Sequence, residues 1–145
     1  MLSDHWPPFE LRIRTPRLEL RYPSDDDLGI LVELASEPVH DPGFMPFTTP
    51  WTRAESPTRE WNALRFWWQL RAGLDVDDWT LPFMVLDEGE PVGVQDLKGN
   101  RFPVTRSVLT GSWLVQRHQG RGVGKEMRAA VLHLAFAGLG DLQPT

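Results

Sequence analysis

The sequence predicts a mixed α/β domain in which a mostly antiparallel sheet is flanked by helices. One observation is an apolar run at residues 113–115, followed by a glycine-rich loop and then a helical pattern of apolar residues. A second is a pair of β-type segments, 79–86 and 91–97, separated by a polar turn containing Gly89, which is typical of an antiparallel hairpin. A length of 145 residues suits one domain with a substantial core, so residues 1–145 are expected to form a single unit.

The N-terminal part is expected to contain short strands and then a capped helix. Apolar residues alternate imperfectly over 11–22, and Thr15 and Pro16 interrupt them, which predicts two short strands or one kinked strand. Ser24 precedes three aspartates, and this pattern predicts a helix start with acids at the positive end of the helix dipole. Pro38 is expected to end this helix, because the residue before a proline disfavours helical geometry.

A second helix is expected to begin at Ser56 and Pro57 and to reach about residue 71. Ser56 is expected to act as its cap and Pro57 to occupy its first helical position. Its apolar residues exceed one helical stripe, so two of its faces are expected to be covered. These residues are Trp61, Leu64, Phe66, Trp67, Trp68 and Leu70.

The C-terminal part is expected to add one more strand and one more helix. Residues 98–106 are expected to connect the hairpin to a strand over 108–115. The helix is expected from Lys125, and Gly138 and the residues after it are expected to close it. Its apolar residues at helical spacing are Met127, Val131, Leu134 and Ala135.

Composition narrows the classes of function. The net charge is −5 and no long basic run is present, so the chain is not expected to bind nucleic acid. The chain has no cysteine, which excludes disulfides, thiolate zinc sites and cysteine nucleophiles, and its four scattered histidines lack metal-ligand spacing. No apolar run approaches membrane-spanning length and no signal peptide is evident, so we expect a soluble, cytoplasmic protein that binds neither a metal nor a membrane.

The loop at residues 119–124 carries the clearest functional pattern. A strand, a glycine loop and a helix together present free backbone N–H groups and a positive helix N-terminus to a phosphate. A nucleotide-binding P-loop is excluded because Gln119 replaces its first glycine and Glu126 its Ser or Thr. The dinucleotide fingerprint is excluded because Lys125 or Met127 stands where its third glycine belongs.

The pattern Gln/Arg-x-x-Gly-x-Gly/Ala after an apolar strand resembles motif A of the GNAT acyltransferases. Residues 15–21, reading TPRLELR, resemble the opening strand of the branch that acetylates ribosomal-protein N-termini. Val92 and Gly93, the segment 111–114, and Glu126 in the following helix also suit this branch. The resemblance covers residues 14–138 and implies a GNAT-like fold.

The resemblance implies acetyl-CoA as the co-substrate and an amine as its acceptor. In the family the loop backbone holds the pyrophosphate, and a strand N–H before the loop, here that of Leu114 or Val115, stabilises the thioester oxygen. The side chains of Arg121 and Lys125 are expected to add positive charge, although they can equally be exposed basic residues. The cofactor-binding residues implied are Leu114, Val115, Gln119, Gly120, Arg121, Gly122, Val123, Gly124 and Lys125.

Acetyl transfer needs a base that removes a proton from the amine. Asp96 is the first candidate, because it is an acid within an otherwise apolar strand; the alternative is a structural carboxylate paired with backbone donors or a buried arginine. Gln95 is expected to orient the substrate, and His118 is expected to be a solvent-facing turn residue. The sole tyrosine, Tyr22, lies on the opening strand, so no general acid is assigned.

The segment between the first two helices is apolar for a loop and is expected to pack on something or to line a pocket. By resemblance, Phe44, Phe47 and Trp51 are expected to bind the acceptor together with Gln95, and the alternative is that these aromatic side chains belong to the core.

The GNAT fold also needs a further strand beside residues 113–115, another helix and a final hairpin. The domain is therefore expected to be incomplete at its C-terminus, with a missing C-terminal half or a second copy covering the open sheet edge. Two other functions stay open besides N-acetyl transfer. One is a non-catalytic module that binds CoA or a nucleotide, and the other is a domain that binds a partner protein through its tryptophans.

Overall fold

The computed structural model describes residues 1–39, 52, 54–101, 104 and 107–139. Its strands are β1 (Arg12–Arg14), β2 (Leu18–Arg21), β3 (Asp78–Asp87), β4 (Glu90–Asn100) and β5 (Val108–Leu114). Its α-helices are α1 (Asp25–Leu34), α2 (Thr58–Ala72) and α4 (Val123–His133). Short 3-10 helices are η1 (Leu2–Asp4), η2 (Pro7–Glu10) and η4 (Gln116–His118), and η5 (Leu134–Leu139) is a π-helix.

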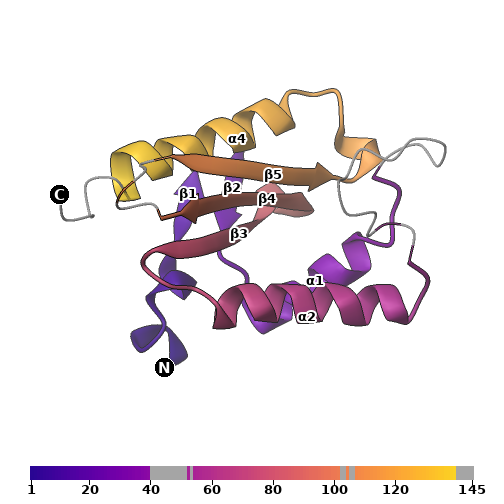
Figure 1. Cartoon of the computed structure of the whole chain (residues 1–145). Helices are drawn as coiled ribbons and strands as arrows, with labels where there is room; N and C mark the ends of the chain where they lie inside the picture. Colours follow the sequence, from indigo (N-terminus) through magenta and orange to yellow (C-terminus); the bar gives the residue numbers. More distant parts are fainter. Residues whose placement is uncertain (40–51, 53, 102–103, 105–106, 140–145) are drawn as a thin grey trace.

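The strands form one sheet in the order β1-β2-β3-β4-β5, and each neighbouring pair is antiparallel (Figure 1). The predicted mixed α/β class with an antiparallel sheet is therefore confirmed. Residues 11–22 form two strands that pair with each other, and the predicted hairpin turn lies between β3 and β4, where Glu88 and Gly89 have φ of 50° and 85°. Among the described strands, β5 has a neighbour on one side only.

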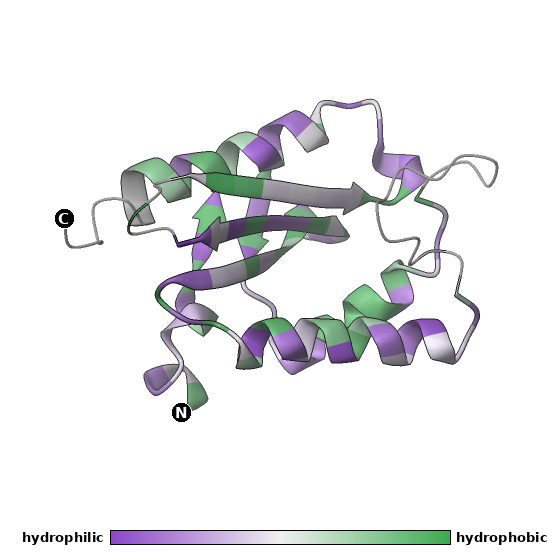
Figure 2. Cartoon of the chain, in the orientation of Figure 1, coloured by the Kyte–Doolittle hydropathy of each residue, from purple (hydrophilic) through white to green (hydrophobic). Residues whose placement is uncertain are grey.

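Helices cover both faces of the sheet (Figure 1), and hydrophobic residues recur along α1 and α4 (Figure 2). On one face, the predicted stripe is buried in a cluster that also contains Phe83 of β3; Met127 and Val131 come from α4 and Ala135 from η5. The other cluster joins α1 and α2 to the opposite face of the sheet. Its buried members are Leu28, Leu31, Leu34, Trp67, Met84, Leu86, Val94 and Val115.

The start of α1 is the predicted capping box. The hydroxyl of Ser24 accepts a hydrogen bond from the Asp27 N–H at 3.1 Å, and the Asp27 carboxylate accepts one from the Ser24 N–H at 3.2 Å. Arg21 of β2 donates to both oxygens of the same carboxylate, at 2.8 and 3.1 Å. The cap therefore fixes the helix to the sheet as well as stabilising its first turn.

Two predictions about α2 are wrong. Pro57 is the N-cap residue, so α2 starts one residue later than expected and has no side-chain cap from Ser56. Only one stripe of α2 is covered: Trp67 is buried, whereas Trp61 and Trp68 are 56% and 45% exposed. Because α2 lies in the outer layer, only one of its sides meets the sheet and α1.

The last helix differs from the prediction at its start. It starts at Val123 rather than Lys125, because Gly122 in the left-handed region (φ 80°) occupies the N-cap position. Beyond His133 the chain continues as the π-helix Leu134–Leu139, so helical structure ends within the predicted glycine segment that begins at Gly138. The glycine loop is consequently shorter than predicted, because its last residues belong to the first turn of α4.

Gly93 allows β4 and β5 to approach each other closely. A Cβ built at Gly93 would lie 2.1 Å from the carbonyl oxygen of Trp113, a distance that no side chain can accommodate. The position adjoins an irregularity in the pairing of β3 and β4 between Val85 and Leu86. The close approach of β5 to β4 therefore requires a glycine at position 93.

We expect Gly93→Ala to destabilise the protein by more than about 2 kcal/mol, because backbone atoms would have to move. Gly29→Ala is the matched control, since Gly29 lies in α1 and a Cβ there would meet nothing within 4 Å. The control should stabilise by about 0.5–1 kcal/mol through helix propensity. Denaturant unfolding measures both, and equal effects of the two substitutions would contradict this account of Gly93.

Candidate functional site

The glycine-rich loop lies between β5 and α4. From Val115 the chain passes through η4, and Gly120 and Gly122 then adopt φ of 79° and 80°. Side chains rarely tolerate these values, so the two turns require glycine. The predicted order of strand, glycine loop and helix is therefore confirmed.

The backbone amides of residues 120–125 have no hydrogen-bond acceptor among the described residues. The first amide of the helix with a partner is that of Glu126, which donates to the Gly122 carbonyl at 3.2 Å. Unpaired amides and the positive end of α4 therefore lie together, as an anion-binding site requires. Lys125 is exposed and forms no ion pair with a described residue, so its charge is available there.

Side chains from the connection between β1 and β2 hold the loop in place. Arg17 donates through Nε to Glu126 Oε1 at 3.0 Å and through its terminal nitrogen to the Arg121 carbonyl at 2.7 Å. The hydroxyl of Thr15 donates to the other oxygen of Glu126. This hydrogen bond, followed by the one from Arg17, lowers the pKa of Glu126. The role of Arg17 is not evident from the sequence, because nothing local relates this residue to Glu126, which is 109 positions away.

Arg121 and His118 interact within the same loop. The Arg121 guanidinium lies 3.0 Å from Asp87 and 2.7 Å from Nδ1 of His118, and Arg117 lies 2.6 Å from Nε2 of the same ring. His118 is 7% exposed, so the prediction of a solvent-facing residue is wrong. Two arginines enclose its ring, although a neutral imidazole offers only one acceptor nitrogen.

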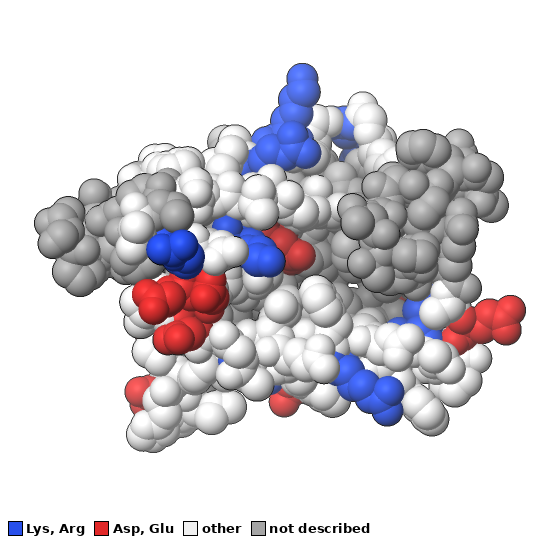
Figure 3. Space-filling model, viewed as in Figure 1, with Lys and Arg blue, Asp and Glu red and all other residues white. Residues whose placement is uncertain are grey.

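Other contacts join the loop to its surroundings. Arg117 donates to Glu37 at 2.9 Å and to Glu90 at 2.7 Å, and these bonds lower the pKa of both carboxylates. The amide of Gln119 donates to the carbonyls of Val39 and Leu114 at 2.8 and 2.9 Å. The Gln119 side chain therefore braces the loop against the end of β5. On the face of the molecule that Figure 3 shows, Lys and Arg side chains lie among Asp and Glu side chains.

The register of β5 distinguishes the two predicted thioester donors. The Val115 N–H donates to the Val92 carbonyl at 3.0 Å, so this amide is already used. In an antiparallel pair, hydrogen-bonded and non-hydrogen-bonded residues alternate. Leu114, which pairs with Gly93, therefore directs its N–H away from β4 and toward the side of β5 where no described strand lies.

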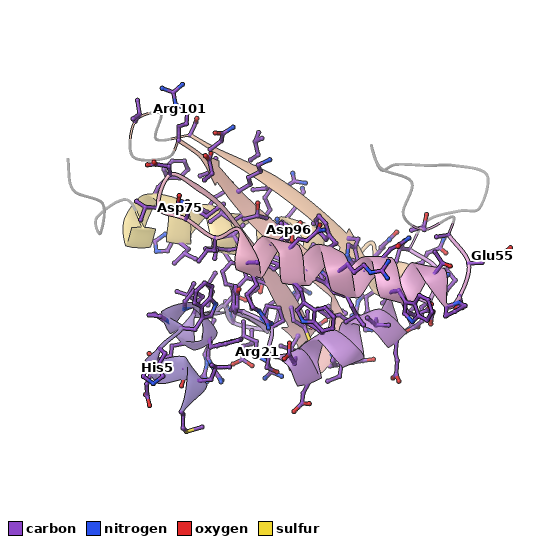
Figure 4. The ribbon with its side chains drawn as sticks, turned by 60° about the horizontal axis from the view of Figure 1, so that its bottom comes forward. His5, Arg21, Glu55, Asp75, Asp96 and Arg101 are labelled. Atoms are coloured by element: carbon purple, nitrogen blue, oxygen red, sulfur yellow. The ribbon has the colours of Figure 1, made fainter. Side chains whose placement is uncertain are left out.

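Asp96 lies two residues after Val94 on β4, so its side chain shares the face covered by α1 and α2 (Figure 4). Its strand neighbours are Pro82 and Gly111, which offer no side-chain donor. The Oδ1 atom is fully enclosed without a partner, and burial raises the pKa of Asp96 to about 7. The alternative of a carboxylate satisfied by an arginine or backbone donors is not seen among the described residues.

Gln95 points to the opposite face of the sheet. It pairs with Phe83, which belongs to the cluster under α4, and its side chain has no exposed surface. Its amide nitrogen donates to the carbonyls of Asp96 and Gly111 at 3.0 and 3.1 Å, and its oxygen has no partner. Asp96 and Gln95 therefore face different layers, and the substrate role of Gln95 stays a prediction.

The predicted acceptor residues Phe44, Phe47 and Trp51 lie outside the described residues. Within the described ranges, no three His, Asp or Glu side chains meet as metal ligands. None of the described helices is long and apolar enough to cross a lipid bilayer.

Residues 17–142 match the family model described as acetyltransferase (GNAT) domain. The chain therefore belongs to the GNAT acetyltransferase family, which the strand, glycine loop and helix had indicated.

Solved structures share the fold. RimJ of Mycobacterium smegmatis, in complex with CoA-disulfide, matches with a TM-score of 0.65 and 21% identity over 90% of this chain and 62% of its own. An acetyltransferase of Salmonella typhimurium that modifies the N-terminal serine of ribosomal protein L7/L12 matches with a TM-score of 0.63 and 17% identity, over 88% and 70%. A RimL ribosomal L7/L12 acetyltransferase in complex with coenzyme A gives the same four values: 0.63, 17%, 88% and 70%.

The raised pKa of Asp96 predicts a pH-dependent stability cost. Between about pH 4 and 7 the folded state keeps a proton that the unfolded chain has released, so stability falls as pH rises through this range. We expect Asp96→Asn to be more stable than the parent protein by roughly 1–4 kcal/mol at pH 8 and nearly equal to it at pH 4. Denaturant unfolding at both pH values tests this, with the exposed Asp77→Asn as the control. A difference that does not depend on pH would contradict it.

Proposed function

We propose that this protein transfers an acetyl group from acetyl-CoA to a primary amine of a small molecule or a protein N-terminus. The observation that carries the proposal is the set of unpaired amides at residues 120–125, at the N-terminus of α4. Membership of the GNAT family supports the same ligand, and so do two of the similar structures, which are complexes with CoA or CoA-disulfide. The pyrophosphate would accept hydrogen bonds from these amides, with Lys125 adding charge.

The chemical step assigns distinct roles to two strands. The N–H of Leu114, directed away from β4, stabilises the thioester oxygen as it gains negative charge. Asp96 accepts the amine proton, directly or through a water molecule, and its pKa of about 7 suits a base that works near neutral pH. The neutral amine nitrogen then bonds to the carbonyl carbon, the carbon–sulfur bond breaks, the nitrogen releases its surplus proton to solvent, and the thiolate takes a proton from solvent.

The proposal also concerns the acceptor of the acetyl group and the segment that covers the edge of β5. The ribosomal-protein acetyltransferases among the similar structures favour a protein N-terminus, and the raised pKa of Asp96 is compatible with any primary amine. We also propose that a further segment of the same protein, or a second copy of the chain, covers the free edge of β5. A cytoplasmic location stays a prediction.

A non-catalytic module that binds CoA is the second candidate. One observation favours this second candidate. Tyr22, the sole tyrosine of the sequence, is buried next to β2, and β3 and β4 separate β2 from β5, so Tyr22 is not placed to act as the general acid. Calorimetry with acetyl-CoA detects both candidates, whereas thiol release in the presence of amine acceptors detects only the transferase.

We expect Gly122→Ala to weaken acetyl-CoA binding at least about tenfold, because a Cβ at positive φ distorts the loop that carries the amides. Gly89→Ala is the matched control, since Gly89 has a similar φ of 85° but lies in the turn between β3 and β4. Calorimetry with acetyl-CoA measures both variants. Unchanged affinity in Gly122→Ala, or an equal loss in Gly89→Ala, would exclude the loop as the binding site.

We expect kcat/KM to rise with pH and to level off above an inflection near pH 7, since only the Asp96 carboxylate accepts a proton. Asp96→Asn should lower kcat by about 100-fold or more and remove this inflection while leaving acetyl-CoA affinity unchanged. Asp77→Asn serves as the control. The base would have to be another group if Asp96→Asn kept the same pH profile.

A further inference from the structure

Three side chains behind the glycine loop form one connected chain of hydrogen bonds. Thr15 and Arg17 belong to the connection between β1 and β2, and Glu126 belongs to the first turn of α4. Arg17 and Thr15 each bind one oxygen of the Glu126 carboxylate, and the Thr15 hydroxyl also accepts a hydrogen bond from the Leu18 N–H at 3.0 Å. All polar atoms of the Glu126 carboxylate are therefore committed to this connection.

Arg17 reaches past Glu126 to the loop itself. Its terminal nitrogen donates to the carbonyl of Arg121 at 2.7 Å, and the position that a Cβ would take at Gly122 lies 3.2 Å from the same nitrogen. The guanidinium thus packs directly against the peptide that joins residues 121 and 122. A side chain at position 122 would press on Arg17, so the glycine and the arginine depend on each other.

This contact determines where one of the free amides points. In a planar trans peptide, the carbonyl of one residue and the N–H of the next point in opposite directions. Because the carbonyl of Arg121 points toward Arg17, the N–H of Gly122 points away from Arg17, on the opposite side of the peptide. That N–H has no acceptor among the described residues, as a ligand-binding amide requires.

The position of Arg17 is itself fixed. Its own carbonyl accepts a hydrogen bond from the Glu88 N–H at 3.1 Å, in the turn after β3. Its guanidinium is oriented by Glu126, whose carboxylate is oriented by Thr15. The planar fork of arginine serves Glu126 and the Arg121 carbonyl with two different nitrogens, and a lysine has no equivalent geometry.

We propose that Arg17 is a positioning residue for the pyrophosphate of acetyl-CoA, with Glu126 and Thr15 holding it in place. Arg17 does not touch the ligand; it fixes the peptide whose Gly122 N–H does. The inference rests on the proposed function, and it assigns a specific task to the motif at residues 15–18, which otherwise only closes the turn between two strands.

The experiment compares two acetyl donors in the full chain. Acetyl-CoA carries the pyrophosphate, whereas acetyl-pantetheine has the same thioester without it. We expect Arg17→Gln to raise KM for acetyl-CoA about tenfold with little change in kcat, and to leave both parameters for acetyl-pantetheine unchanged. Glu126→Gln should act in the same direction, and Arg17→Lys should restore only part of the affinity.

Arg14→Gln is the matched control, because Arg14 lies three residues from Arg17, carries the same charge and has a side chain that is 78% exposed. It should leave KM for both donors unchanged. Thermal unfolding checks that each variant is folded, and Arg17→Lys replaces Arg17→Gln in the comparison if the latter does not fold.

Two results would overturn the inference. Unchanged KM for acetyl-CoA in Arg17→Gln would show that the amide does not need this support. An equal loss with both donors would show that Arg17 only braces β1 and β2 against α4. A parent protein that binds neither donor would instead refute the proposed function, and calorimetry with acetyl-CoA separates that outcome from the other two.

Discussion

The structure depends on a row of backbone amides that have no partner within the described protein. An unpaired amide is costly unless water or a ligand accepts its hydrogen bond, so residues 120–125 have to remain accessible. They also have to be held in place, because a mobile loop would lose entropy on binding. The protein meets both requirements by attaching the loop from behind, through Arg17 on the Arg121 carbonyl and through Gln119 on the end of β5. The amides of residues 120–125 and the charge of Lys125 are left available to a ligand.

A second constraint acts on the sheet. Asp96 is enclosed on one side without a partner, and the same desolvation that makes its carboxylate costly brings its pKa near neutrality. Stability and the proposed role as a base are therefore coupled at this residue, since stability is commonly lost where a site is arranged for function. The two-layer packing maintains this environment: α1 and α2 cover the face of Asp96, while α4 covers the face of Gln95. The packing of the helices on the sheet thus sets the environment of the proposed base on β4.

Local patterns predicted the features that depend on near neighbours in the chain. The capping box at Ser24, the turn at Gly89 and the stripe of Met127 and Val131 each follow from residues within a few positions of one another. The prediction for α2 was wrong because its composition could not show that only Trp67 meets the sheet. An apolar residue can occupy an exposed helical face without disturbing the helix, so hydrophobic content alone does not fix the number of buried faces.

The sequence by itself determined the class of fold, the family and the glycine loop, because these depend on the order and spacing of residues along the chain. Only the tertiary structure decided how the loop is supported, which of Leu114 and Val115 has a free amide, and that His118 lies buried between two arginines. The physical reason is the range of the contacts. Arg17 and Glu126 are 109 positions apart, and their interaction exists only after the sheet and α4 have packed together.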